Sequence, residues 1–422
     1  MRVGLEYGEG RLWIELPDDR TTVIEPISGP ELPDPDGALK KALREPIASL
    51  PLRQIAQAGQ TVAISVCDIT RPQPRKEVLG AILSELDGIV RPEDVVILIA
   101  TGTHRVNTTE ELTQMLGREI ADTHRVVNHV GTDPSTLIDL GMMGDGVPVS
   151  LNREWMAADL RITTGVVEPH FFAGFSGGPK MVAPGLAGIE TVLALHDARR
   201  IGHQNSRWGL INGNPVHDAV RAIAEATGVD FSIDVTLNRD QQITGVFAGS
   251  LFAMHEHACV SVKNTSMQSV ESAFDIVVTS NSGYPLDQNL YQAIKGISAA
   301  AEIVKTDGTI VCAAECRDGL PDHGGYGQIL ASRDTPEALQ AMIGAPGYSV
   351  PDQWQGQIQA RIQQRATVLM KTDGLGDREL RAAHIEPVAD VEATVKDLLT
   401  DYGENATVCV LPEGPRTVPY LR

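Results

Sequence analysis

The sequence predicts an α/β protein of two domains with largely parallel sheets. Short apolar runs alternate with segments of helical periodicity, which is typical of parallel strands joined through helices. The length of 422 residues exceeds what one ordinary core needs and suits two domains. Hydrophobic residues make up 42% and aromatic residues only 4%, so we expect folded cores built mainly from aliphatic side chains.

The first domain is expected to span residues 1–267. Its strands are predicted at three buried apolar runs, TVAISV (61–66), DVVILIA (94–100) and LRITTG (160–165). Helices are expected at the following places: from about Arg75, near Gly188–Arg199, at Pro215–Ala226 with Asn214 as cap, and at His255–Asn264.

The second domain is expected to span residues 268–404. FDIVVTS (274–280) and GTIVCAA (308–314) predict strands, and one long helix is expected between them, from Asp287 to Lys305. The run ATVCVLPEG predicts one more strand within residues 405–422, which could return to the first domain.

Charge and cysteine usage narrow the class of protein. The formal net charge is −20, and an acidic surface repels phosphate backbones and anionic lipids, so we expect neither nucleic acid nor membrane as a partner. The five cysteines are scattered, and the closest pair, Cys312 and Cys316, lacks the second pair of a zinc site. Without a signal peptide or an apolar run of 18 residues, a cytoplasmic protein with reduced thiols is expected.

Two predicted turns place polar side chains beyond the carboxyl ends of buried strands, where α/β sheets bind ligands. CDITRPQP carries Asp68 and Arg71, and an arginine fork suits a carboxylate. Taken alone, the two residues are better explained by a local Asp–Arg pair that shapes the turn. TGTHR places His104 beyond Gly102, as either a general base or a structural histidine.

The segment after the third strand is the strongest candidate. VVEPHFFAGFSGGPKMVAPGLAG combines His170 and Lys180 with glycines and phenylalanines, and polar groups within apolar, glycine-rich turns commonly serve a ligand. Gly177 and Gly178 could bring backbone N–H groups close to an anion. A Walker phosphate loop is excluded, because Pro179 precedes the lysine and no Ser or Thr follows it. The alternative interpretation is a glycine-rich surface loop that binds no ligand.

Of three further histidines, only His196 is a candidate. His196 follows Lys180 by sixteen residues, near the apolar face of the helix expected around Gly188–Arg199. A lone histidine there is usually part of the core, and it becomes a ligand candidate only beside a metal. His255 and His257 are interpreted as surface residues.

The long helix at 287–305 has a polar face. Gln288, Tyr291, Gln292 and Lys295 recur at spacings of three and four residues and therefore lie on one side. A solvated face explains this pattern. A face turned toward a cleft between the domains explains it too, and Lys295 would then supply a second cation for an anionic substrate.

Together these residues resemble the nickel-pincer lactate racemase family, in order and spacing and over nearly the whole chain. The matching positions are Asp68, Arg71, His104, His170, Lys180, His196, Gln292, Lys295 and Trp354. The resemblance implies two α/β domains with the active site in the cleft between them. It also implies racemisation or epimerisation of a 2-hydroxy acid at C2.

The implied cofactor is a nickel-pincer nucleotide, pyridinium-3-thioamide-5-thiocarboxylate mononucleotide carrying Ni. By this resemblance Lys180 is the residue joined to the cofactor as a thioamide, and His196 supplies a further nickel ligand. Asp68 matches a site residue of the family, and Gly177 and Gly178 are expected to contact the cofactor. Proteins that synthesise and insert the cofactor are the implied partners.

The implied reaction is hydride transfer, because the C2–H of a 2-hydroxy carboxylate is too weakly acidic for simple deprotonation. By resemblance, His104 and His170 are the acid/base groups, one for each enantiomer. Arg71 and Lys295 would bind the substrate carboxylate. The residues expected to line the site are Tyr291, Gln292 and Trp354.

One position departs from the lactate-specific pattern, in which an arginine precedes the tether lysine. Pro179 stands there in this chain, so the sequence predicts a 2-hydroxy acid or sugar acid and not lactate in particular. Two alternatives are kept. One is a zinc-dependent hydrolase or lyase with His104, His170 and His196 as ligands, and the other is a non-catalytic relative that binds the cofactor.

Overall fold

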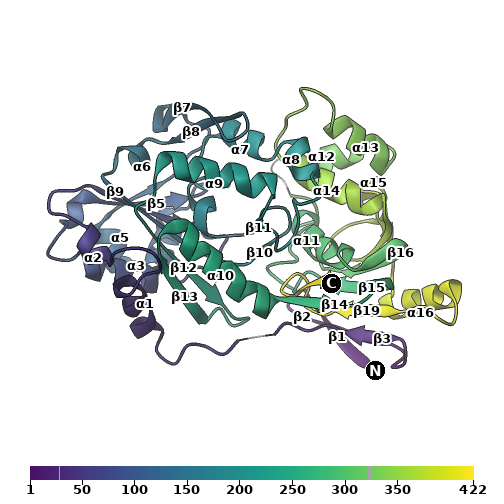
Figure 1. Ribbon diagram of the computed structural model, residues 1–422. Coiled ribbons are helices and arrows are strands. Elements are labelled where there is room, and N and C mark those ends of the chain that lie inside the picture. Colours follow the sequence, from purple (N-terminus) through teal and green to yellow (C-terminus); the bar gives the residue numbers. More distant parts are fainter. Residues whose placement is uncertain (28, 322–324) are drawn as a thin grey trace. The chain divides into compact units, whose positions relative to one another are not determined.

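The computed structural model describes residues 1–27, 29–321 and 325–422, which form two compact units (Figure 1). The first unit comprises Ser28–Leu195 and Asn205–Lys263, and the second comprises Met1–Ile27, His196–Gln204 and Asn264–Arg422. Each unit contains a largely parallel six-stranded sheet with helices. The α/β fold class predicted from the sequence is therefore confirmed.

The sheet of the first unit has the strand order β13-β12-β9-β4-β5-β6, and only the β12–β13 pair is antiparallel. In that order the strands are β13 (Ile243–Gly249), β12 (Phe231–Leu237), β9 (Leu160–Val166), β4 (Val62–Cys67), β5 (Val95–Ala100) and β6 (Arg125–Asn128). The three strands predicted from apolar runs are thus the adjacent strands β4, β5 and β9. Their carboxyl ends lie at one edge of the sheet.

Both faces of this sheet are buried, because successive side chains of a strand point to opposite sides. Ile64 and Val66 of β4 lie in one apolar cluster with α1, α2 and α3, whereas Ala63 lies in another with α6, α7 and α9. Figure 1 shows these helices on the two sides of the sheet. The helices of this unit are α1 (Pro35–Arg44), α2 (Leu52–Ile55), α3 (Arg75–Leu86), α4 (Thr109–Leu116), α5 (Arg118–Thr123), α6 (Arg153–Ala157), α7 (Ile189–Leu195), α9 (Pro215–Thr227) and α10 (Leu251–Ser266).

Two short hairpins complete the first unit. They are β7 (Leu137–Met143) with β8 (Val147–Asn152), and β10 (Pro169–His170) with β11 (Gly174–Phe175). The cap predicted for α9 is confirmed, since the Asn214 side chain accepts hydrogen bonds from the amides of Val216 and His217.

The sheet of the second unit is parallel throughout, in the order β18-β17-β16-β15-β19-β3. Its strands are β18 (Glu386–Pro387), β17 (Ala366–Lys371), β16 (Val304–Ala313), β15 (Phe274–Ser280), β19 (Val408–Leu411) and β3 (Thr21–Val23). A further parallel pair joins β14 (Met267–Val270) to β20 (Val418–Leu421).

Apolar side chains of one face of this sheet pack against α16 and the hairpin of β1 and β2. The hairpin strands are β1 (Arg2–Tyr7) and β2 (Gly10–Glu15). The helices of this unit are α8 (Ala198–Gly202), α11 (Leu290–Ala301), α12 (Tyr326–Ala331), α13 (Pro336–Ile343), α14 (Gln353–Gln363), α15 (Asp377–Ala382) and α16 (Val391–Tyr402).

The predicted domain boundaries need correction in two places. The first 27 residues belong to the second unit, because β3 and the β1–β2 hairpin pack there. The tail does not return to the first domain, because β19 lies between β15 and β3. Both pairings join segments distant in the chain, so local patterns could not reveal them.

Two predicted helices also differ from the structure. The helix expected at 287–305 is shorter, since Asn289 caps α11, which ends at Ala301. The helix expected near Gly188–Arg199 is broken. α7 ends at Leu195. Asp197 has extended backbone angles, and its side chain caps the separate helix α8. His196 therefore lies between two helices.

The five cysteines are buried free thiols, as the sequence predicted. Among the residues described here, no helix combines the length and the apolarity needed to cross a bilayer.

The core of the first unit can be tested at Ile64, which is fully buried in β4. Ile64→Ala should lower the free energy of unfolding by about 2–5 kcal/mol, because it leaves a cavity in a packed core. Val260→Ala is the control, since 63% of that side chain is exposed, and it should change stability by no more than about 0.5 kcal/mol. Urea titration measures the free energy of unfolding of both variants. Equal losses in Ile64→Ala and Val260→Ala would contradict the described core.

Candidate active site

Three turns at the carboxyl edge of the first unit's sheet carry five polar or charged side chains of the predicted site. The turn after β4 holds Asp68 and Arg71, and the turn after β5 holds His104. The loop after β9 holds His170 and Lys180. Because β9, β4 and β5 are neighbours, the three turns meet at one end of the sheet.

The turn after β4 is shaped by Arg75 and not by the Asp68–Arg71 pair considered from the sequence. The buried Arg75 guanidinium donates hydrogen bonds to the carbonyl oxygens of Cys67 at 2.7 Å, Arg71 at 2.7 Å and Gln73 at 3.1 Å. It also bonds the carbonyl oxygen of Asp68. A cation enclosed by backbone carbonyls fixes the path of the turn. The Asp68 carboxylate adds hydrogen bonds from the amide and the hydroxyl of Thr70.

Buried hydrogen bonds tie the other loops to this turn. Gln73 donates to Thr164 Oγ1 of β9 at 2.8 Å, and Ser65 Oγ of β4 donates to the carbonyl oxygen of Met181 at 2.9 Å. The amide of Gly102 donates to the carbonyl oxygen of Gly185 at 3.0 Å. The loop with Lys180 is therefore fastened to strand β4 and to the turn after β5.

Asp68 and His104 form a hydrogen-bonded pair. The buried Asp68 carboxylate accepts from His104 Nδ1 at 2.7 Å and from Thr70 Oγ1 at 2.6 Å. Burial alone would raise the pKa of Asp68. The hydrogen bond from His104, the charge of His104 and the hydrogen bond from Thr70 together hold that pKa below its ordinary value. The pair turns His104 Nδ1 to the carboxylate and leaves Nε2 for another partner.

Arg71 has a guanidinium available for an anion. Its hydrogen bonds go to the backbone and hydroxyl oxygens of Thr70, both at 3.4 Å, and no described carboxylate forms an ion pair with it. Because an arginine fork matches a carboxylate, Arg71 is suited to bind one at this edge of the sheet.

Lys180 lies in the short 3₁₀ helix Gly178–Met181, beside His170. Its Nζ is 3.5 Å from His170 Nε2 and 5.4 Å from the ring centroid of Phe172. Burial, with a smaller contribution from the charge of Arg71, lowers the pKa of Lys180 to about 7. Much of the amine is therefore neutral near pH 7, which is the form that acts as a nucleophile.

The orientation of His170 follows from its own loop. The backbone amides of Ala173 and Phe172 donate to His170 Nδ1, at 3.3 Å and 3.5 Å. In a neutral imidazole these bonds assign the proton to Nε2, the nitrogen that faces Lys180. Phe172 packs edge-on against the His170 ring with centroids 4.4 Å apart, so the ring is held on both sides.

Gly177 and Gly178 let the lysine loop lie directly on buried polar side chains. Both have positive φ, 70° and 52°. A Cβ on Gly177 would lie 2.7 Å from Asp234 Oδ2, and one on Gly178 would lie 2.4 Å from the His255 ring. The Gly178 amide donates to Asp234 Oδ2 at 2.7 Å, so it is not available to a ligand anion as the sequence suggested.

Sequence reasoning missed the buried support beneath this loop. His255, interpreted as a surface residue, is buried on α10, and its Nε2 lies 2.9 Å from the carbonyl oxygen of Ser176. His217 stacks on it with centroids 5.9 Å apart. Burial raises the pKa of Asp234 to about 7 and lowers the pKa values of His255 and His217 to about 4 and 3. The sequence feature that could have revealed this support was Asp234, an aspartate within the apolar run of β12.

The other predicted residues lie in the second unit, where His196 and α14 form a compact group. The rings of His196 and Trp354 have centroids 4.7 Å apart, and both residues are buried. Trp354 Nε1 donates to the hydroxyl of Tyr291 at 3.1 Å. These contacts bring together three residues that are far apart in the sequence.

Lys295 and Gln292 occupy the same face of α11, as their spacing predicted. Lys295 Nζ donates to Gln292 Oε1 at 2.6 Å. The amide oxygen thus fixes the direction of the ammonium group.

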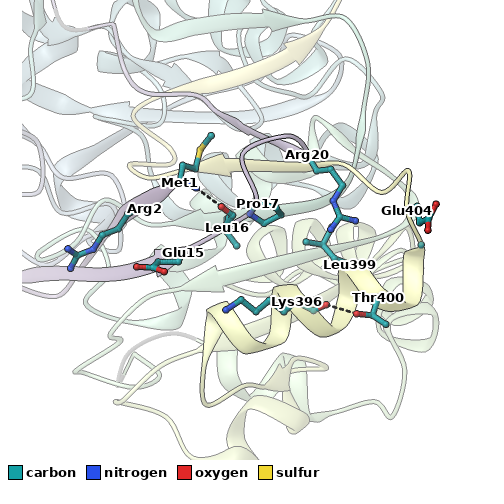
Figure 2. A pocket seen from close by; sticks show the side chains of 11 residues that line it. Met1, Arg2, Glu15, Leu16, Pro17, Arg20, Lys396, Leu399, Thr400 and Glu404 are labelled. Carbon is teal, nitrogen blue, oxygen red and sulfur yellow. Dashed lines mark hydrogen bonds between the residues drawn. The ribbon is translucent and has the colours of Figure 1, made fainter.

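A surface pocket of the second unit contains none of these residues (Figure 2). It lies between the β1–β2 hairpin and α16. Its lining residues are Met1, Arg2, Glu15, Leu16, Pro17, Arg20, Lys396, Leu399, Thr400, Gly403 and Glu404. Lys396 pairs with Glu392 and the N-terminal ammonium with Asp18, so these cations are already matched by carboxylates.

A zinc site from His104, His170 and His196 gains no support from the structure. Within the described residues, no group of three or more His, Cys, Asp and Glu side chains is arranged to hold a metal ion. His104 is bonded to Asp68, and His170 faces an amine.

The packing of the lysine loop predicts the effect of Gly178→Ala. The added methyl group would collide with His255 at a positive φ, so we expect a loss of about 1–3 kcal/mol of stability and a displaced Lys180. Gly80→Ala is the control. Gly80 lies in α3 with no atom near its Cβ position, and this change should be neutral or slightly stabilising. Thermal unfolding of both variants measures these changes in stability. A Gly178→Ala protein as stable as the wild type would contradict the described contact with His255.

The pKa of Lys180 predicts its reactivity in protein without cofactor. Acylation of Lys180 should rise with pH and reach half its maximum near pH 7, because deprotonation creates the reactive amine. Arg71→Met should shift this midpoint upward, since it removes a positive charge that lowers the pKa. Mass spectrometry of labelled peptides follows the reaction. A midpoint near that of ordinary lysines would show that the amine is not enclosed as described.

Two family models match the chain. The lactate racemase N-terminal domain matches residues 7–209, and the lactate racemase C-terminal domain matches residues 269–418. The chain is 35% identical to the lactate racemase of Lactiplantibacillus plantarum over 378 residues, 89% of each chain. It is 31% identical to the lactate racemase of Thermoanaerobacterium thermosaccharolyticum over 417 residues, 98% of this chain and 97% of that protein.

Solved structures agree with this relationship. The lactate racemase apoprotein from Thermoanaerobacterium thermosaccharolyticum superposes with a TM-score of 0.92 at 30% identity and covers both chains completely. A protein from Thermotoga maritima, at 18% identity and a TM-score of 0.66, shares the fold over 93% of this chain and 100% of its own. This chain therefore belongs to the lactate racemase family and is an isomerase, a racemase.

Proposed function

We propose that this racemase inverts the C2 stereocentre of a 2-hydroxy acid with a nickel-pincer nucleotide attached to Lys180. The observation that carries the proposal is the partly buried Lys180 amine with a pKa of about 7, beside His170 and at the same sheet edge as the Asp68–His104 pair. Two similar proteins are lactate racemases. Because Pro179 replaces the arginine of the lactate-specific pattern, we propose the broader class of 2-hydroxy acids as substrate.

The residues present fit the proposed cofactor. Thioamide formation needs a neutral amine, and Lys180 supplies one near neutral pH. Imidazole is a suitable nickel ligand, and the buried His196 is proposed to serve as one. A single protein ligand suffices if the cofactor supplies the others. When bound, the cofactor supplies a hydride acceptor for C2.

The chain supplies the acid/base groups. The substrate hydroxyl must lose its proton as the C2 hydrogen leaves as hydride, and it must regain a proton when that hydrogen returns. Asp68 would orient His104 so that Nε2 can take this proton. This assigns to Asp68 a role that the sequence left open. His170, oriented by the amides of Ala173 and Phe172, would serve the other enantiomer.

Substrate binding is assigned to two cations. Arg71 and Lys295 would hold the carboxylate, while the planar 2-keto acid reorients between its two faces. Gln292 directs Lys295, and Tyr291 and Trp354 offer aromatic surface to the rest of the substrate. We also propose that proteins that synthesise and insert the cofactor act on this chain before it becomes active.

The proposed function is tested with protein made in a host that produces the cofactor. One enantiomer of several 2-hydroxy acids is supplied, and chiral chromatography follows the appearance of the other. We expect inversion of at least one acid, nickel in the protein, and an added mass on Lys180 that is absent from Lys180→Ala. Protein from that host with neither nickel nor adduct would refute the proposal. Nickel without inversion of any acid would favour the non-catalytic alternative.

The proposed role of Asp68 predicts a specific kinetic effect. Asp68→Asn should lower kcat/KM by about 10²–10⁴-fold, because the base loses its orientation, with nickel and the Lys180 adduct retained. The equilibrium constant between enantiomers is one, so kcat/KM must fall equally in both directions. Thr70→Val is the matched control; it removes another hydrogen bond to Asp68 and leaves the bond to His104. An effect as large as that of Asp68→Asn would assign Asp68 a structural role only.

A further inference from the structure

Three residues of α14 recur at intervals of four and donate hydrogen bonds to one segment of backbone. Gln357 Nε2 donates to the carbonyl oxygen of Ala198 at 2.8 Å, and Arg361 Nη1 donates to that of Ile201 at 2.9 Å. Gln353 Nε2 approaches the carbonyl oxygen of His196 at 3.5 Å, a weaker contact. Residues at this spacing share one helix face, so the three form a stripe, here called the donor stripe.

The segment that receives these bonds lies against α14. Residues 196–204 belong to the second unit, although the chain on both sides of them belongs to the first. α8 within the segment has five residues, too few to be stable as an isolated helix. The Asp197 cap fixes its start, but the segment needs tertiary contacts to hold its place.

The contacts continue along the helix beside the donor stripe. The ring of Trp354 lies against the ring of His196. A Cβ on Gly202 would lie 3.0 Å from Gln357 Nε2, so the segment approaches α14 closely at both of its ends. The backbone and the imidazole of His196 are thus both in contact with one helix.

The choice of glutamine at these positions is informative. Gln353 and Gln357 are each only 1% exposed, and no hydrogen-bond partner for Gln357 Oε1 exists among the described residues. Burying an amide whose oxygen is unsatisfied costs stability that an apolar side chain would not. What the amide adds is a directional bond to Ala198, which sets where the segment lies.

We propose that the donor stripe of Gln353, Gln357 and Arg361 positions His196 as a metal ligand. The three are positioning residues, because they act through the backbone of residues 196–202 and not on substrate or metal. The inference rests on the proposed function for the role of His196 itself. Groups that orient a metal ligand commonly change metal affinity by about 10–100-fold when they are removed.

The test compares two glutamines of the same helix. Gln357→Met removes the donor to Ala198 with little change in side-chain volume. Gln363→Met is the matched control, because Gln363 donates to carbonyl oxygens of Ala383 and His384, at 2.9 Å and 2.8 Å, outside the segment. Arg361→Met tests the stripe a second time, should Gln357→Met fail to fold.

Two measurements are made on each variant. Deuterium exchange of the cofactor-free protein should increase in residues 196–204 for Gln357→Met and Arg361→Met, and not for Gln363→Met. In the holoenzyme, nickel release to a chelator should be at least about tenfold faster for the two stripe variants, with the Lys180 adduct intact by mass.

The outcomes separate this inference from the function on which it rests. Wild-type protein without nickel or adduct refutes the proposed function, and the exchange data still decide whether the stripe holds the segment. Wild-type protein with nickel, and stripe variants equal to it in exchange and release, would overturn the inference. Equal changes in Gln363→Met would overturn it too, since they would reflect general loosening of α14.

Discussion

The hydrogen bond from the Gly178 amide to the buried Asp234 carboxylate is the contact on which the lysine loop depends. It forms only because Gly177 and Gly178 lack side chains and can lie on Asp234 and His255. Lys180 follows two residues later, and its position within the loop is what encloses the amine. The lowered pKa of Lys180, and hence its suitability as an attachment point, follows from how closely this loop is packed.

The two units hold their functional side chains by different means. In the first unit, three turns at one sheet edge are joined by buried bonds such as that of Ser65 to Met181. In the second unit, His196 lies between two helices and is held by side chains of α14. Under the proposed function, covalent attachment and metal ligation fall to residues of two different compact units.

Much of the fold could be predicted from local patterns, because β4, β5 and β9 are continuous apolar runs and ligand turns follow such strands. The break before α8 was missed, since a capping Asp197 looks like any polar residue within a helical pattern. His255 was misjudged because its burial depends on the loop at Ser176, which is distant in sequence. The tail strand was misplaced for the same reason, as its partners β15 and β3 are both distant from it in sequence.

The central claim is that C2 inverts by hydride transfer, and the fate of the hydrogen at C2 tests it most directly. Holoenzyme is incubated in D₂O with one enantiomer of a 2-hydroxy acid that it inverts, and the inverted product is examined for deuterium at C2 by mass spectrometry. Transfer as hydride and return of the same hydrogen predicts product that keeps protium at C2, with deuterium only on the exchangeable hydroxyl. Deuterium at C2 in proportion to inversion would show proton abstraction by a base and contradict the account.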